Sequence, residues 1–562
     1  MKKIKVLAIA LALALTTTGC KKEEASMSKD TTSINSDYIH LTMVKPKTIN
    51  PINNSEKSVN YIMNLVYDSL FTIDSNYNTV PQLVDTYKIT SNGKVIEIQL
   101  KDAKWHNGNS ITSADVKFTI DLIKQSTEST YKPFVENISS VSIVDNKTFR
   151  INFDSTYAFS IDTLIFPIVC KSELSKVDSK EIDNYKNNMV GSGAYKISKY
   201  NQRSDMLLTL NEDYYDKDKI KSAKKEISVA MVPDEEAQVS MTLALASDIT
   251  KLNLSDLSKF YEKEFKIDDY EGRGYEYLIF NYDNSLINDI NFRKAIAYAI
   301  DKQKIIDEAY VGNATLVNFP LHSKSKYYDS ELKGYDYNLE NSKKYLEKIK
   351  SIKENIETNS KEGTNSNNDK STKEKLDINN NSVKEENNTI NNKNEESKEE
   401  VFNLKEELKA LNFRIVVNKE NRERVKAAYI IRENLNEIGI KSIVEELEMN
   451  DLSSRLDKKE YDLALIGWEL PAIPDATEII IYSGYEDEKL NAYLQSLVVS
   501  TNKNNTESIY KAIQKYTRDK VAFISLGITD DYLVTNKRIS GELSPNDFDI
   551  YEGIYQIGLE KW

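Results

Sequence analysis

The chain has 562 residues, 40% of them hydrophobic and 9% aromatic. This predicts three to four domains at roughly 150 residues each and excludes a chain that is disordered throughout. Its net charge of −13 disfavours nucleic-acid binding, which needs a surplus of Lys and Arg on one face, and its two Cys and three His predict neither a disulfide scaffold, nor a metal centre, nor a cofactor.

The N-terminal segment has the pattern of a secretion signal. Met1–Lys5 is positively charged, and Val6–Leu15 is apolar but too short to cross a bilayer of about 30 Å as a helix. Residues 1–20 resemble a bacterial lipoprotein signal peptide, which implies lipidation of Cys20 and a flexible tether over residues 21–36. The protein would then be extracytoplasmic and anchored to the cell membrane by lipid. An ordinary signal peptide with an incidental Cys is the alternative.

Strand patterns dominate the next part of the chain. Val95–Leu100 and Thr148–Phe153 alternate apolar and polar residues, which predicts strands with one buried face. Between them, Thr112 and Asp115 form a capping-box pattern that predicts a helix to about Lys124.

Two helices are predicted in the middle of the chain. Apolar residues at helical spacing from Phe292 to Ile300, with Asp289 as the N-cap, predict the first, and the second covers Lys302–Tyr310. Farther on, residues 361–400 contain eleven Asn and seventeen charged residues. Such a segment cannot bury enough apolar surface to offset the entropy lost on ordering, so we expect a disordered insertion over residues 352–402.

After the insertion, strand and helix patterns alternate. Strands are predicted at Phe413–Val417, Ile440–Leu447 and Tyr461–Ile466, with helices at Arg422–Ile438 and Asp451–Leu456 between them. Gly439 is placed to end the first of these helices. This β-α-β-α-β order predicts parallel strands joined by right-handed crossovers.

Several residues of conspicuous motifs have local structural interpretations. Trp105 is predicted to lie in a core, and His106 to form hydrogen bonds in a turn. Gly191 and Gly193 are expected to adopt backbone angles that other residues avoid.

Eight motifs along the chain occur in an order typical of one family. They are Thr48–Pro51, Val66–Phe71 with Val80–Leu83, Leu100–Val116, Val190–Tyr195, Asn211–Tyr215, Phe292–Ile296 with Asp301, Glu437–Ile440 and Tyr461–Trp468. With them, the chain from about Asp37 to Gly553 resembles the extracytoplasmic solute-binding proteins of family 5, the oligopeptide- and dipeptide-binding lipoproteins of ABC importers.

The resemblance implies an α/β, two-lobed periplasmic-binding-protein-like fold with two hinge crossings and an extra subdomain in the N-terminal lobe. The expected divisions are lobe I at 37–272 with the extra subdomain at 53–189, lobe II at 273–519 and a C-terminal return to lobe I at 520–562. The crossings are expected near Tyr270–Tyr275 and Lys520–Ala522.

The resemblance also implies a function. The protein would be a monomer without catalytic residues that captures oligopeptides or dipeptides between its lobes and delivers them to a membrane permease. Three alternatives stay open: another solute such as a sugar, an opine or a metal chelate, a peptide-sensing lipoprotein without transport, and a hydrolase. The last is least favoured because no convincing Gly-x-Ser-x-Gly or His-Glu-x-x-His set occurs.

Candidate ligand contacts follow from the family's motifs. They are Val44, Lys45, Pro46, Lys47, Phe280, Asn281, Gly467, Trp468, Glu469, Pro471 and Asp475. The family's peptide binders place a carboxylate for the peptide ammonium three residues after the Trp of the Gly-Trp motif, because a charge-assisted hydrogen bond contributes about 1.5–3 kcal/mol. Here that position is Pro471, and Glu469 or Asp475 could replace the carboxylate if the loop is shifted.

Overall fold

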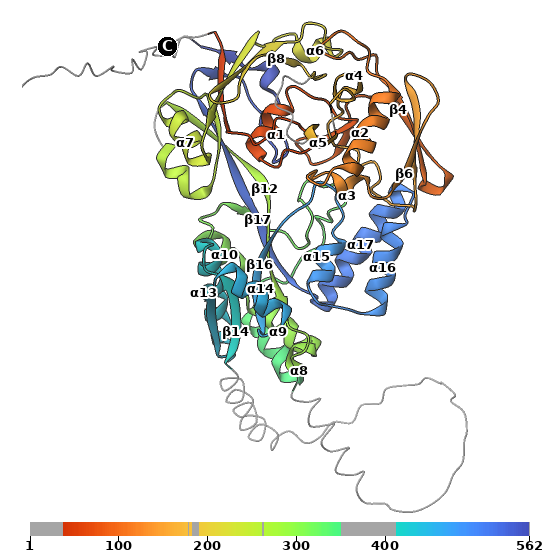
Figure 1. The fold of residues 1–562 in the computed structure, drawn as a ribbon. Helices are drawn as coiled ribbons and strands as arrows, with labels where there is room; N and C mark the ends of the chain where they lie inside the picture. Colours follow the sequence, from red (N-terminus) through yellow and green to blue (C-terminus); the bar gives the residue numbers. More distant parts are fainter. Residues whose placement is uncertain (1–36, 178, 183–189, 261–263, 350–411, 561–562) are drawn as a thin grey trace, which may run out of the picture.

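The computed structural model describes residues 37–177, 179–182, 190–260, 264–349 and 412–560. The predicted signal peptide, tether, Cys20 and disordered insertion lie outside these residues. The described part forms two lobes that are joined by a pair of long strands (Figure 1). Within it, no helix combines the length and the apolar character that crossing a bilayer requires.

Two four-stranded sheets form the framework of lobe I. The first has the order β1 (Ile39–Val44), β10 (Glu226–Val232), β9 (Asp205–Leu210) and β8 (Tyr195–Asn201), with β1 and β10 parallel. The second has the order β4 (Val84–Thr90), β5 (Val95–Leu100), β7 (Thr148–Phe153) and β6 (Ile138–Ile143), all antiparallel. It confirms the two strands that alternation predicted, and it lies within residues 53–189, where we expected an extra subdomain.

The helices of lobe I are short apart from one. They are α1 (Lys57–Met63), α2 (Ser113–Gln125), α3 (Lys132–Val135), α4 (Lys171–Leu174), α5 (Ser179–Ile182), α6 (Lys217–Ile220) and α7 (Glu235–Leu243), with 3-10 turns at Ser91–Gly93, Leu254–Phe260 and Ile554–Gln556. Small strand pairs are β2 (Phe71–Ile73) with β3 (Thr79–Pro81) and β18 (Ile539–Ser540) with β19 (Gly558–Leu559). The predicted capping box begins α2, where the Thr112 amide donates to the Asp115 carboxylate at 2.9 Å.

A seven-stranded sheet runs through lobe II and continues into lobe I. Its order is β11 (Ile249–Leu252), β17 (Ile524–Asn536), β12 (Phe265–Phe280), β16 (Leu463–Glu469), β14 (Phe413–Asn418) and β15 (Ser442–Leu447), while β13 (Ala314–Thr315) pairs with β17. Strand β14 is parallel to both β15 and β16, which confirms the parallel pairing that the alternating pattern predicted.

Helices cover both faces of this sheet in lobe II. One group is α8 (Ser285–Asn288), α9 (Ile290–Ala299), α10 (Lys302–Glu308) and α13 (Arg422–Glu437), and residues 339–349 are also helical. The others are α14 (Met449–Asp457), α15 (Thr477–Tyr482), α16 (Glu488–Val498) and α17 (Lys503–Lys520). The predicted caps are confirmed, since the Asp289 carboxylate accepts from the Asn291 amide at 2.7 Å and Gly439, with φ of 89°, follows α13.

Two long antiparallel strands connect the lobes (Figure 1). In lobe I, β12 residues 265–271 pair with β17 residues 530–536, and in lobe II residues 274–278 pair with residues 524–529. The register shifts between Glu271 and Gly274, within the first expected crossing. The second crossing was expected at residues 520–522, which lie at the end of α17. On β17, the residues opposite the register shift are Thr529 and Asp530. The lobe boundaries at 272/273 and 519/520 stay predictions.

The prediction for the two motif glycines is wrong, because neither Gly191 nor Gly193 has a positive φ. A Cβ on either residue would instead overlap the backbone carbonyl of Val66 or Leu65. Close approach between two chain segments, rather than unusual backbone angles, therefore requires glycine here. Trp105 is buried, as predicted, and His106 Nε2 lies 2.9 Å from the Gly193 carbonyl oxygen.

Candidate ligand site between the lobes

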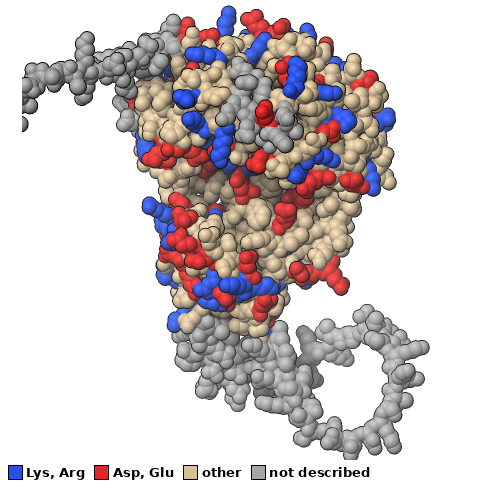
Figure 2. Space-filling model, viewed as in Figure 1, with Lys and Arg blue, Asp and Glu red and all other residues tan. Residues whose placement is uncertain are grey.

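Two adjoining cavities lie where the lobes meet. The first, of about 30 Å³, is lined by Tyr77 from lobe I, Arg273 from β12, the segment 320–325 and the loop Leu470–Asp475 that follows β16. The second, of about 290 Å³, shares Arg273 and Ala472 with the first and extends into lobe I. On the face seen in Figure 2 the molecule is hollowed between the lobes, and acidic side chains border the hollow. A site between the lobes therefore has walls from both.

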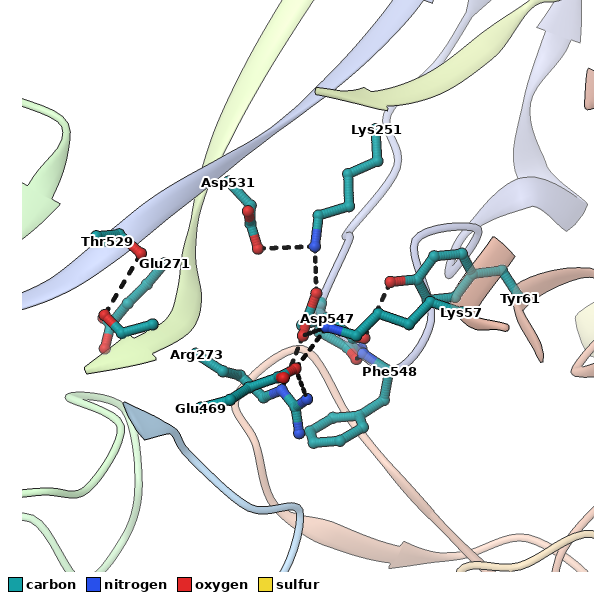
Figure 3. A network of polar contacts seen from close by, with 12 residues as sticks. Lys57, Tyr61, Lys251, Glu271, Arg273, Glu469, Thr529, Asp531, Asp547 and Phe548 are labelled. Atoms are coloured by element: carbon teal, nitrogen blue, oxygen red, sulfur yellow. Dashed lines mark hydrogen bonds and ion pairs between the residues drawn. The ribbon is translucent and has the colours of Figure 1, made fainter. Parts of the chain in front are cut away.

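A buried carboxylate, Asp547, lies at the centre of an ion-pair network beside these cavities (Figure 3). It contacts Lys251, Arg273 Nε at 2.8 Å and Lys57 Nζ at 3.5 Å, and Lys251 also pairs with Asp531 at 2.9 Å. Burial opposes ionisation of Asp547, but the three cations outweigh it and hold its pKa well below the ordinary range. Because its charge is already compensated, Asp547 has no need of a cationic ligand.

Glu469, one of the predicted contacts, is the lobe II member of the same network. Its carboxylate pairs with Lys57 Nζ at 2.5 Å and with the Arg273 guanidinium (Figure 3). Burial acts to raise the pKa of Glu469, but Arg273 and Lys57 lower it below the ordinary value. Glu469 therefore links the end of β16 to α1 of lobe I and is itself paired.

Asp475 offers a carboxylate of a different kind. One oxygen accepts a hydrogen bond from the Tyr157 hydroxyl at 2.9 Å, and the other accepts from the Thr477 amide at 3.0 Å at the start of α15. Within the described part of the chain it forms no ion pair, and it lines the first cavity. Since a carboxylate can accept about four hydrogen bonds, Asp475 keeps the capacity to bind a cationic group.

An aromatic pair forms another wall of the first cavity. The rings of Tyr77 and His322 stack with centroids 3.5 Å apart and an interplanar angle of 22°. Burial lowers the pKa of His322 to about 4, although a hydrogen bond with the Glu271 carbonyl opposes the shift. His322 is therefore neutral near pH 7 and presents an uncharged imidazole.

Several predicted contacts lie elsewhere. Lys45 follows β1 and donates its amide to the Val232 carbonyl at 2.7 Å, and Val44 donates to the Ser58 hydroxyl. Neither these residues nor Pro46 and Lys47 line the two cavities described above.

Phe280 and Asn281 lie at the far end of β12. Phe280 is 1% exposed in the core of lobe II, and Asn281 donates its side-chain amide to the carbonyls of Lys459 and Tyr461 at 2.8 Å. These contacts give both residues structural roles within lobe II.

Gly467 and Trp468 lie on β16 before the loop. A Cβ on Gly467 would overlap the Arg424 guanidinium, which forms an ion pair with Glu276, so packing explains this glycine. The Trp468 ring packs edge-on against Tyr482 with centroids 5.3 Å apart. The structure thus brings only Glu469, Pro471 and Asp475 of the predicted set to the cavities or their ion-pair network.

Sequence reasoning missed the residues that complete this region. They are Lys57, Tyr77, Tyr157, Lys251, Arg273, His322 and Asp547. Of these residues, only Arg273 could have been identified from its neighbours in the sequence, because Gly272 and Gly274 flank this charged residue within a strand. A Cβ on either glycine would meet Asp531 or Thr529 of β17, so the glycines allow close contact where the lobes join.

The sequence matches a family model described as bacterial extracellular solute-binding proteins, family 5, over residues 78–491. The chain belongs to this family. A relative along its full length is the oligopeptide-binding protein AppA of Bacillus subtilis, which is 21% identical over 594 residues, covering 100% of this chain and 98% of the relative.

Solved structures are similar to both lobes together. The substrate-binding protein CtaP of Listeria monocytogenes superposes with a TM-score of 0.71 at 21% identity, covering 93% of this chain and all of that one. NikZ of Campylobacter jejuni, in complex with Ni(L-His), gives a TM-score of 0.61 at 23% identity, covering 93% and 99%. These similarities confirm the predicted two-lobed α/β fold. The protein is therefore an extracellular solute-binding protein of family 5.

Proposed function

We propose that the protein binds short peptides between its lobes through their free amino terminus and delivers them to a membrane permease, while a lipid on Cys20 holds it at the cell surface. The main support for peptide binding comes from Asp475. Its carboxylate lines the cavity between the lobes and forms no ion pair in the described part of the chain.

Charge distinguishes Asp475 from the other carboxylates of the site. A peptide ammonium enclosed between lobes needs a carboxylate, because an unpaired buried charge is costly. Asp547 and Glu469 already pair with Lys and Arg side chains, whereas the donors that contact Asp475 among the described residues are neutral. Asp475 lies four residues beyond Pro471 in the same loop. It could therefore replace the carboxylate that the family's peptide binders have at the position of Pro471, if the loop is shifted. The full-length similarity to an oligopeptide-binding protein supports the same ligand class.

A second candidate is an amino-acid chelate of a metal. His322 lines the same cavity and is neutral near pH 7, which suits an imidazole that contacts such a complex. The similar structure NikZ holds Ni(L-His).

Thermal unfolding tests the two candidates. A pool of tri- to pentapeptides with free amino termini should stabilise the protein, by about 2.7 kcal/mol at a concentration of 100 Kd. The same pool with acetylated amino termini should have no effect. Asp475→Asn keeps the contact with Thr477 but should raise the Kd for peptides about tenfold or more, because it removes the charge that faces the ammonium.

The matched control is Asp487→Asn, which changes a lobe II carboxylate that Tyr485 and Tyr516 contact. It should leave peptide binding unchanged. Equal stabilisation by free and acetylated peptides would contradict recognition of the amino terminus. Stabilisation by Ni(L-His) and by no peptide would favour the chelate.

A further inference from the structure

A loop of lobe I, residues 156–160, contacts lobe II through residues outside the hinge strands. We call it the arm. The Ala158 amide donates to the Val498 carbonyl at the end of α16 at 2.8 Å, and the Tyr157 hydroxyl donates to Asp475 at 2.9 Å. The arm is rooted in lobe I, where Thr156 donates to the Asn92 carbonyl at 2.8 Å.

The arm inserts an aromatic side chain into the core of the other lobe. Phe159 is 0% exposed, and its ring centroid lies 5.8 Å from that of Tyr327 and 6.1 Å from that of Tyr510, which lies on α17. In Figure 1, α16 and α17 lie below lobe I and to one side of β12 and β17. The lobes are thus connected at the hinge and again at the arm, and separating them requires Phe159 to leave lobe II.

Tyr157 connects the arm to the candidate ligand site. Burial and the neighbouring Asp475 raise the pKa of Tyr157, so the hydroxyl stays protonated and donates. When the arm docks, it removes water from a carboxylate that has no cationic partner among the described residues, and this costs free energy. A ligand ammonium at Asp475 would compensate that cost, because the oxygen that accepts from Tyr157 retains a second lone pair.

We propose that the arm is a closure latch in which Phe159 holds the lobes together and Tyr157 couples closure to occupancy of Asp475. The coupling rests on the proposed function, whereas the latch does not. Tyr157 is a positioning residue: it contacts the carboxylate that binds the ligand. Contacts made only in the closed state are those through which a ligand can shift the lobe equilibrium.

The test uses the full chain, with hydrogen exchange at the Ala158 amide and the radius of gyration from X-ray scattering as readouts. In the absence of ligand, Phe159→Ala should speed exchange at Ala158 at least tenfold and increase the radius of gyration. Phe159→Leu keeps an apolar side chain in the same place and should have a smaller effect. If the Ala158 amide of Phe159→Ala exchanges at the wild-type rate, the proposal of a latch is wrong.

Tyr157→Phe tests the coupling. It should raise the Kd of the free-amino tri- to pentapeptide pool about tenfold and reduce the compaction that the pool induces. Tyr485→Phe is the matched control. It also removes a tyrosine hydroxyl that donates to an Asp carboxylate, at 2.7 Å, but both residues lie within lobe II. Equal Kd values for Tyr157→Phe, Tyr485→Phe and wild type would overturn the coupling. If no peptide binds the wild type, the peptide assignment fails, and ligand-free exchange at Ala158 alone decides the latch.

Discussion

Arg424 and Glu276 form a bidentate ion pair inside lobe II, with Nε–Oε2 and Nη2–Oε1 distances of 2.7 and 2.8 Å. Both side chains are largely buried, so each needs the other, and loss of one partner from such a pair costs about 3–5 kcal/mol. Gly467 lies directly against the pair, and no space remains there for a Cβ atom.

We therefore predict that Gly467→Ala lowers the free energy of unfolding by about 3 kcal/mol, because the new methyl group displaces the Arg424 guanidinium. Urea unfolding at pH 7 measures the change. Glu276→Gln breaks the same pair by another route, so the double variant should lose much less than the sum of the two. Additive losses would show that Gly467 acts independently of the pair.

The first turn of helix α2 joins several parts of lobe I. Asp115 accepts from the Thr112 amide at 2.9 Å and, through its other oxygen, from the Lys171 amide at the start of α4 at 3.0 Å. We predict that Thr112→Ala destabilises lobe I by about 1 kcal/mol because it removes the cap hydroxyl. Thr112→Ser retains the hydroxyl and should unfold in urea near the wild-type midpoint. Equal midpoints for all three proteins would contradict the role of the cap.

Elements whose signals are local could be predicted from the sequence. The alternation in β5 and β7, the helical spacing in α9 and the capping box of α2 each depend on residues within one or two turns or one strand. The ion-pair network does not, because Lys57, Arg273 and Asp547 lie on α1, on β12 and after β18, far apart in the chain. The Gly-Trp motif identified the loop after β16. It could not show which carboxylate of this loop lacks a cationic partner, because the Lys and Arg side chains concerned lie outside the motif.

The hinge that joins the two lobes carries carboxylates on neighbouring strands. Glu271 and Asp530 are direct cross-strand partners on β12 and β17. Burial, followed by the charges of Asp269 and Glu271, raises the pKa of Asp530 to about 7. Because the raised pKa makes ionisation unfavourable in the folded state, Asp530 reduces stability as pH rises from about 4 to about 7, and the loss persists at higher pH.

We predict that Asp530→Asn raises the free energy of unfolding at pH 8 by about 1–2 kcal/mol, allowing for solvent screening of a partly exposed group. The gain should largely disappear at pH 4, where the carboxyl is protonated in the folded state and about half protonated in the unfolded state. Urea titrations at the two pH values measure the difference, with exposed Asp85→Asn as the control. A gain that is the same at both pH values would show that charge is not its cause.

Strand β17 completes both lobes, since it pairs with β11 and the first half of β12 in lobe I and with the second half of β12 in lobe II. A chain cut before residue 524 would therefore lack the strand between β11 and β12, and β12 would keep only its partner β16. Such a cut would separate β11 from the rest of the sheet and leave β12 as the only strand shared by the two lobes.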